Sequence, residues 1–176
     1  ILDRDPEVLE KVGTHFEARA STRFSNAANL HDAVCNADLV IGAVLIPGAA
    51  APKLVTRDML KDMQKGAVLV DVAIDQGGCF ETSKPTTHAD PTYVVDDIVH
   101  YCVANMPGAV ARTSTYALNN VTLPHALRIA RMGWKDALAA DPHLAEGLNV
   151  HKGEVTYEAV ASELGYDYRP VAELTR

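Results

Sequence analysis

The sequence lacks the marks of membrane, nucleic-acid-binding and disulfide-rich proteins. No apolar run in its 176 residues is long enough to cross a bilayer, and no targeting segment is visible. The formal net charge of −7 argues against a broad basic surface for a phosphate backbone. Cys35, Cys79 and Cys102 have no paired spacing. We therefore expect no membrane or nucleic-acid partner, no disulfide framework and no zinc site.

The histidines give no metal signal either. They are scattered, and none lies in a paired metal-binding spacing, so surface or packing roles are expected for all seven. They are His15, His31, His88, His100, His125, His143 and His151.

What the chain does have is a set of short apolar runs, each followed by glycine, proline or small residues. Residues 39–44 and 97–104 each lead into a Pro-Gly turn, and residues 66–78 end in two aspartates and a glycine pair. Such runs predict strands buried on both faces of a parallel sheet. With 48% hydrophobic and 22% charged residues, the chain can bury a core. The pattern predicts an α/β fold with a partial doubly wound, Rossmann-like parallel sheet.

Two more strands are expected near the N-terminus. Residues 1–3 are typical of the tail of a strand, and Asp5 and Pro6 are an N-cap and a first helical residue. Residues 20–24 supply the next strand. In the order 3-2-1-4-5-6 these are strands 2 and 3, and the central strand 1 has no counterpart in the sequence. We expect two unpaired strand edges unless another segment or chain fills the gap.

The carboxyl ends of parallel strands meet at one edge of a sheet, where nucleotides bind. We therefore expect Asp3, residues 46–48, Asp75 and residues 105–107 to line one crevice. An acid that closes the second strand hydrogen-bonds the ribose 2′-hydroxyl, so Asp3 favours NAD over NADP. The motif G-x-G-x-x-G does not occur in these residues.

Two carboxylates follow the buried run at residues 66–78. An unpartnered buried carboxylate is costly, so Asp71 and Asp75 should meet a ligand, backbone amides or solvent. On a continuing strand they point to the same face. Asp71 is then either a structural acid or a group that positions the site residues without touching the ligand. Cys79, after the glycine pair, is expected to be a small buried residue rather than a nucleophile.

Past Pro107 the pattern becomes helical. Apolar spacing predicts a long helical segment over residues 113–140, in which Pro124 starts a new helix or kinks the old one. Three smaller elements follow: a short helix over 142–148, a hairpin over 150–157 that turns at Lys152-Gly153, and a final helix over 157–164 ended by Gly165.

Three stretches of the sequence resemble bacterial L-alanine dehydrogenase. They are residues 42–56 (GAVLIPGAAAPKLVT), 70–79 (VDVAIDQGGC) and 101–110 (YCVANMPGAV), and the likeness runs over nearly the whole chain. In that family a nicotinamide-binding domain is inserted into a catalytic domain. The resemblance implies that residues 1–107 are a partial NAD-binding domain with strands 2–6. Residues 108–176 would then be a helical segment and small hairpin that return to the catalytic domain.

The resemblance also implies which residues contact NAD. The family's ribose-binding acid falls on Asp3, and its catalytic aspartate, which also contacts the cofactor, falls on Asp75. Another implied contact is Ser25, at the adenosine. The rest follow the three apolar runs: Val44 and Leu45 after the run at 39–44, Val72, Ala73 and Ile74 within the run at 66–78, and Val103, Ala104, Asn105 and Met106 at the end of the run at 97–104. Val8 replaces a basic residue that some relatives have near the ribose. Arg128 replaces an acid proposed to hold magnesium in some relatives, so no metal is expected there.

The implied reaction is the reversible oxidative deamination of L-alanine to pyruvate and ammonium, with NAD as cofactor. Asp75 would orient the ammonium and a water while a histidine acts as general acid and base. In the family that histidine, and the lysine and arginine that hold the substrate carboxylate, lie upstream. The 176 residues alone are therefore expected to bind NAD poorly and turn nothing over. The resemblance further implies a cytoplasmic homohexamer completed by the N-terminal half of the same protein.

Two other interpretations stay open. Residues 45–48 and 51–56 are also similar to the nucleotide-binding domain of proton-translocating transhydrogenase. That family lacks an aspartate at the position of Asp75, because it passes hydride between two nucleotides. The third interpretation is a non-catalytic fragment or assembly module.

Overall fold

The computed structural model describes residues 1–175, which fall into two compact units. The first unit comprises Ile1–Val44 and Ala51–Ala104, and the second comprises Leu45–Ala50 and the chain from Asn105 onward. The division predicted from the sequence, after residue 107, stays a prediction.

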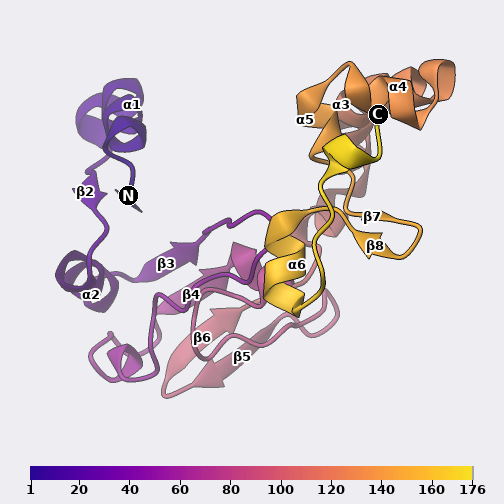
Figure 1. Cartoon of the computed structure of the whole chain (residues 1–176). Helices are drawn as coiled ribbons and strands as arrows, with labels where there is room; N and C mark the ends of the chain where they lie inside the picture. The colour runs from indigo at the N-terminus through magenta and orange to yellow at the C-terminus, as the bar shows by residue number, and fades with distance from the viewer. Residues whose placement is uncertain (176) are drawn as a thin grey trace. The chain divides into compact units, whose positions relative to one another are not determined.

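The first unit is built on a four-stranded sheet with the order β3-β4-β6-β5 (Figure 1). Its strands β3, β4 and β6 are parallel, and β5 pairs with β6 in the antiparallel direction at the edge. This is the α/β fold with a parallel sheet that the apolar runs predict. The strands are β3 (Leu39–Gly42), β4 (Val68–Asp71), β5 (Thr92–Val95) and β6 (Ile98–Tyr101).

The hairpin of β5 and β6 differs from the single strand predicted over residues 97–104. Asp96 and Asp97 both have positive φ, 51° and 64°. Two such residues in a two-residue loop match the twist of a hairpin, and aspartate tolerates this conformation better than most residues. The predicted run therefore contains β6, and the structure adds an antiparallel edge strand, β5, just before it.

The core of the first unit lies on one face of this sheet. Leu69 of β4 and His100 of β6 are paired in the register and point into it, and both are fully buried. Each large apolar side chain buried there contributes about 1.5–3 kcal/mol. The largest apolar side chains that are fully buried there are Phe80, Leu60, Leu69, Ile98 and Val55.

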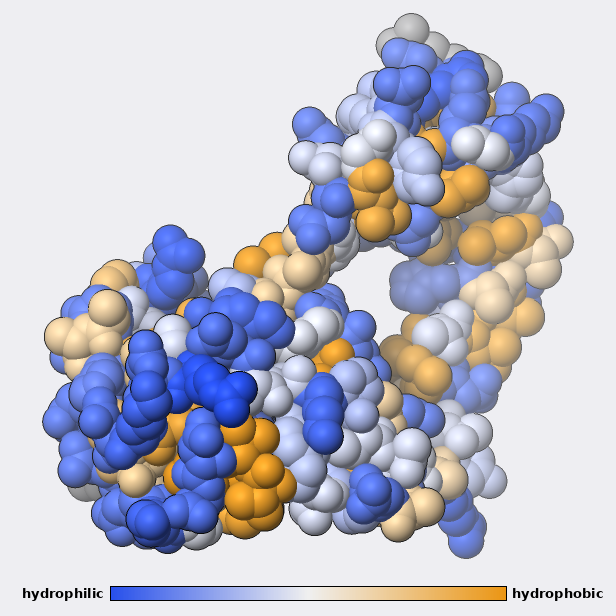
Figure 2. Space-filling view, turned by 90° about the horizontal axis from the view of Figure 1, so that it is seen from below, coloured by the Kyte–Doolittle hydropathy of each residue, from blue (hydrophilic) through white to orange (hydrophobic). Residues whose placement is uncertain are grey.

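The opposite face of β3 is open. Leu39 and Ile41, which alternate with the half-buried Val40, are 54% and 61% exposed. A strand in the middle of a doubly wound sheet is normally covered on both faces. Figure 2 shows hydrophobic side chains of the chain reaching the surface among hydrophilic ones.

A separate two-stranded parallel sheet pairs β1 (Leu2–Asp3) with β2 (Arg23–Phe24). Among residues 1–175 it has no ladder to the four-stranded sheet, so β1 and β3 each keep an unpaired edge. This is the arrangement predicted for a sheet that lacks its central strand. The connecting elements are α1 (Pro6–Phe16), η1 (Glu17–Arg19), α2 (Ala27–Cys35), η2 (Met59–Lys61) and η3 (Val72–Gln76).

Local signals explain where the first helices begin. The Asp5 side chain caps α1 by accepting a hydrogen bond from the Glu7 backbone N–H, and Pro6 is the first helical residue. Asn26 caps α2 in the same way through the N–H of Asn29. Such caps satisfy donors that a helix start leaves free.

The second unit is helical. Its elements are η4 (Met106–Val110), α3 (Ala111–Met132), α4 (Trp134–Ala139), α5 (Pro142–Ala145), β7 (Val150–His151), β8 (Glu154–Val155), α6 (Glu158–Leu164) and η5 (Val171–Glu173). The predicted hairpin turns at Lys152 and Gly153, both with positive φ, and Gly165 ends α6 in the left-handed conformation. The hairpin and the final helix are thereby confirmed.

The sequence left two outcomes open at Pro124, the start of a new helix or a kink in the old one. Pro124 lies inside α3, which continues through it, so no new helix starts there. The break falls at Gly133, whose φ of 79° is outside the helical range. None of the helices within residues 1–175 is long and apolar enough to span a bilayer.

Candidate functional site

The parallel strands of the first unit bring three following segments to one edge of the sheet. Gly42 of β3 is level with Asp71 of β4, and Val70 of β4 is level with Tyr101 of β6. The chain leaves this edge at Val44, at η3 and at residues 102–104. Nucleotides bind at this edge in doubly wound sheets. The expected contacts of the first unit after β3, β4 and β6 therefore gather there.

Asp75 does not lie on a strand. The chain turns after Asp71 into the 3-10 helix η3, which ends where the N–H of Gly77 (φ 86°) donates to the carbonyl of Ile74 at 3.0 Å. The prediction that Asp71 and Asp75 share one strand face is therefore wrong. Asp75 is exposed, whereas Ala73 and Ile74 have buried side chains. Those two residues can offer a ligand only their backbone groups.

Asp71 is fully buried and holds the loop that follows the glycine pair. Its Oδ2 accepts hydrogen bonds from the backbone N–H of Cys79 at 2.9 Å and of Phe80 at 3.3 Å, and from the Ser83 hydroxyl. These charge-assisted bonds compensate for burying the carboxylate. Of the two roles the sequence left open, the contacts are those of a structural acid.

The loop also depends on glycine at position 78. Gly78 has a φ of 76°, and a Cβ there would lie 2.7 Å from Asp71 Oδ2 and 2.7 Å from Ser83 Cβ. At Gly77 the same addition meets nothing within 4 Å. The glycine pair is therefore needed for the protein's own packing, at least at its second position.

Cys79 is fully buried beneath the same loop. Burial, followed by the negative charge of Asp71, raises the pKa of its thiol to about 12. A nucleophilic cysteine needs the opposite shift. The sequence expectation that Cys79 is a packing residue is confirmed.

Lys53 fixes the loop from the other side. Its Nζ donates to the carbonyls of Gly77 at 2.5 Å and Gly78 at 2.7 Å. Two backbone hydrogen bonds join the same segments: the N–H of Ala51 donates to the carbonyl of Gln76, and the N–H of Leu54 donates to the carbonyl of Cys79. The sequence analysis missed Lys53, because a single lysine after a Pro-Gly turn carries no local pattern. The turn that presents Asp75 is thus held by Asp71 and by Lys53.

A buried histidine supports the next part of the loop. The Nδ1 of His100 is 3.0 Å from the Ile98 carbonyl, which can only accept, so Nδ1 carries the proton and Nε2 accepts from the Thr82 hydroxyl at 2.7 Å. Burial lowers the pKa of His100. Tyr93 stacks on its ring, 4.9 Å between centroids, and donates to the Thr82 carbonyl. His100 is a neutral packing residue, as predicted.

The expected ribose residues lie together in the small sheet. Asp3 ends β1, its Oδ1 accepts from the N–H of Asp5 at 2.9 Å, and its carbonyl accepts from the N–H of Ser25 at 2.8 Å. Both side chains are half-buried. The structure therefore brings Asp3 and Ser25 side by side at the end of a strand, the position that the ribose acid takes in dinucleotide-binding units.

The remaining expected contacts belong to the second unit. Asn105 adopts the left-handed conformation (φ 56°, ψ 51°) just before η4, Met106 is half-buried, and Leu45 is exposed. Gly48 packs against Tyr157, since a Cβ on it would lie 2.5 Å from that ring. The crevice expected among Asp3, residues 46–48, Asp75 and residues 105–107 stays a prediction.

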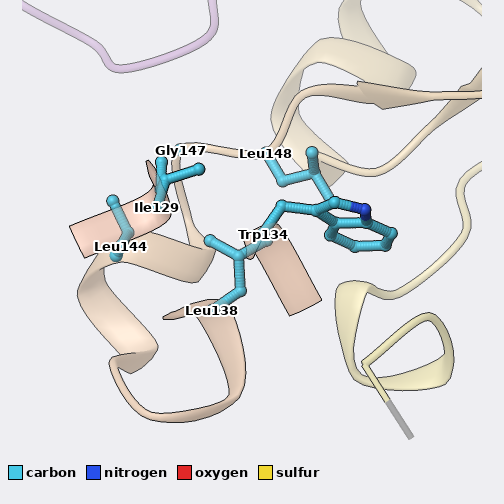
Figure 3. Close-up of a pocket in the computed structure, with 6 residues that line it drawn as sticks. All are labelled: Ile129, Trp134, Leu138, Leu144, Gly147 and Leu148. Atoms are coloured by element: carbon cyan, nitrogen blue, oxygen red, sulfur yellow. The ribbon is translucent and has the colours of Figure 1, made fainter. Parts of the chain in front are cut away.

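A small apolar pocket lies within the second unit and holds none of the expected site residues (Figure 3). It is lined by Ile129, Trp134, Leu138, Leu144, Gly147 and Leu148. Its lining offers no charged side chain, so it contributes nothing to the candidate site.

Comparison with known families gives one consistent answer. A family model described as "Alanine dehydrogenase/PNT, C-terminal domain" matches residues 1–158. The chain is 63% identical over 174 residues to an alanine dehydrogenase from Halomonas elongata, and 53% identical over 173 residues to one from Mycolicibacterium smegmatis. These matches cover 99% and 98% of the chain but 47% of each relative. The chain thus spans about half the length of the curated relatives it matches.

Solved structures agree in fold. A structure of L-alanine dehydrogenase matches with a TM-score of 0.80 and 48% identity, covering 94% of this chain and 45% of that one. A transhydrogenase from Sinorhizobium meliloti matches less well, with a TM-score of 0.63 and 28% identity over 90% of this chain and 42% of that one.

Proposed function

Since the chain belongs to the family of the alanine dehydrogenase/PNT C-terminal domain, we propose that it is the C-terminal part of an NAD-dependent alanine dehydrogenase. The whole protein would oxidise L-alanine reversibly to pyruvate and ammonium. The observation that carries this proposal is the 63% identity to an alanine dehydrogenase over 99% of the chain.

NAD is the proposed cofactor, and the chain's residues suit it. Asp3 and Ser25 would hold the adenosine ribose, because they meet at the end of β1. The remaining contacts would come from Val44, Leu45, Val72, Ala73, Ile74, Asp75, Val103, Ala104, Asn105 and Met106. When bound, NAD supplies the hydride acceptor for the alanine Cα.

Asp75 is the proposed catalytic residue of this chain. It is exposed at the sheet edge where nucleotides bind, on a turn held by Lys53 and by the Asp71 network. A carboxylate fixed there would orient the substrate ammonium and the water that later attacks the oxidised carbon. General acid and base work would fall to a histidine outside this chain.

The proposed partner is the N-terminal half of the same protein. The chain spans 47% of its relatives, and the edges of β1 and β3 are unpaired among the described residues. A central strand between them would complete the sheet, and the elements that cover the faces of a complete sheet would bury Leu39 and Ile41. We also propose that the protein is cytoplasmic and assembles as a homohexamer.

The transhydrogenase interpretation is the second candidate. It is favoured only by the more distant structural match. Asp75 argues against it, because hydride transfer between two nucleotides has no ammonium to orient. A non-catalytic fragment or assembly module is the third candidate.

Assays of the intact protein separate the three. With L-alanine and NAD we expect steady formation of reduced nicotinamide, and with pyruvate, ammonium and NADH we expect its consumption. Hydride transfer between two nucleotides without alanine would instead support the transhydrogenase. Absence of both activities in a folded protein that contains both halves would contradict the proposal and leave the assembly module.

A further inference from the structure

Three side chains with metal-binding atoms meet on the surface of the first unit. They are His31 and Cys35 of α2 and Asp62, the residue after η2. Their candidate ligand atoms all lie within 4.8 Å of one another. His31 Nε2 is 3.0 Å from Asp62 Oδ2 and 3.7 Å from Cys35 Sγ.

The fold explains why these residues meet. His31 and Cys35 are four residues apart on one helix, so they lie on the same helix face. Asp62 comes from the connection between β3 and β4, and η2 packs on α2. The three groups therefore come from two different connections of the sheet.

We propose that His31, Cys35 and Asp62 form a binding site for a Zn²⁺ ion. Imidazole nitrogen, thiolate and carboxylate are the donors that Zn²⁺ takes in proteins, four-coordinate and tetrahedral. Usual Zn bond lengths in that geometry separate N from O by about 3.4 Å and N from S by about 3.6 Å. The observed separations of 3.0 Å and 3.7 Å lie within about 0.4 Å of these values.

The charges suit a divalent cation. On binding, the Cys35 thiol loses its proton to solvent as the S–Zn bond forms, and His31 binds as neutral imidazole through a ring nitrogen. With the Asp62 carboxylate, two negative ligands balance the ion. Asp32, also on α2, is paired with Arg23 at 2.5 Å and is not among the three ligands. The side chains of His31 and Asp62 are 49% and 60% exposed, so water can take the fourth position.

Without the ion, His31, Cys35 and Asp62 make only weak contacts with one another. Burial raises the pKa of the Cys35 thiol, with smaller contributions from Asp62 and Asp32, so the thiol keeps its proton and faces the His31 ring. His31 and Asp62 form an exposed surface pair, and such pairs contribute little to stability. A bound Zn²⁺ would replace these contacts and tie α2 to η2.

Sequence spacing alone predicted no zinc site. Paired spacing among the histidines and among the cysteines does not register His31 and Cys35, one of each type, and Asp62 is separated from His31 by 31 positions. Taken singly, His31 looks like a surface histidine, Cys35 like a free cysteine and Asp62 like a solvated acid.

The proposal is tested by titrating the intact, metal-free protein with Co²⁺ and then displacing it with Zn²⁺. We expect the near-ultraviolet charge-transfer band of a Co–thiolate bond, abolished by Cys35→Ser. His31→Gln and Asp62→Asn should each weaken binding by more than about tenfold, the lower end of what losing a supporting partner of a ligand costs. Asp58→Asn is the matched control: Asp58 lies next to η2, pairs with Lys61, and should not affect binding.

A second readout distinguishes binding from loss of fold. Zn²⁺ should raise the melting temperature of the native protein and of Asp58→Asn, but not that of Cys35→Ser. A thiolate band that survives Cys35→Ser would overturn the proposal. Equal Zn²⁺ affinity of the native protein and folded Cys35→Ser would overturn it too.

Discussion

The carboxylate of Asp71 accepts a hydrogen bond from the backbone N–H of Cys79 at 2.9 Å, with both groups completely buried. Asp71 ends β4, and Cys79 follows the glycine pair, so this bond closes the turn that carries Asp75. The geometry of the proposed catalytic residue therefore depends on a second aspartate that a ligand need not touch.

Asp71→Asn should destabilise the protein. Cys79, Phe80 and Ser83 all donate hydrogen bonds to the carboxylate. The asparagine amide removes its charge and puts a donor in place of one of its two acceptor oxygens. We expect the free energy of unfolding to fall by about 1.5–3 kcal/mol, the range for hydrogen bonds to a charged group. Urea denaturation of the intact protein measures it. The exposed Asp58→Asn should change it little, and equal losses in the two variants would contradict the assigned role.

The two glycines should respond differently to alanine. Gly77→Ala has open space and costs only the left-handed conformation, about 1–2 kcal/mol. Gly78→Ala adds contacts at 2.7 Å with Asp71 Oδ2 and Ser83 Cβ. The melting temperature of Gly78→Ala should therefore fall clearly further than that of Gly77→Ala. Identical melting temperatures would show that the loop does not pack as described.

His100 should make stability depend on pH in acid. Burial lowers its pKa in the folded state, so the unfolded chain takes up its proton first as pH falls below about 6.5. The stabilisation is complete above that pH and is lost as pH falls through the folded-state pKa. Urea midpoints of the native protein should decline over this range more steeply than those of His100→Gln. Parallel curves would contradict a buried neutral imidazole.

Cys79 should resist alkylation in the folded protein. Raising the thiol pKa from 9.0 to about 12 lowers the thiolate fraction near neutral pH about a thousandfold. Peptide mapping after brief iodoacetamide treatment should find the half-buried Cys35 modified well before Cys79 and Cys102. In urea all three should react alike. Early modification of Cys79 in the native protein would rule out its buried placement.

The sequence predicts the elements whose signals are local. Apolar runs place β3, β4 and β6, Asp5 and Pro6 start α1, and Gly165 ends α6. The expectation of an absent central strand also follows from strand order alone.

The elements that depend on tertiary contacts were missed. Val72 to Gln76 look like more strand but form η3, because the Asp71 carboxylate draws the following loop back onto the end of β4. Of the two outcomes predicted at Pro124, a new helix does not occur, because α3 continues through it and stops at Gly133. The Lys53 contacts and the meeting of Asp62 with His31 join residues far apart in sequence.

The most direct test of the central claim is the rate of alanine oxidation by the intact protein with Asp75 changed to asparagine. Asparagine keeps the size and exposure of the side chain but removes its charge. The account predicts a fall in kcat of about 10²–10³-fold, the range for losing one preorganised group that stabilises charge at the reacting atoms, with the melting temperature nearly unchanged. A kcat within about twofold of the native value would contradict the account.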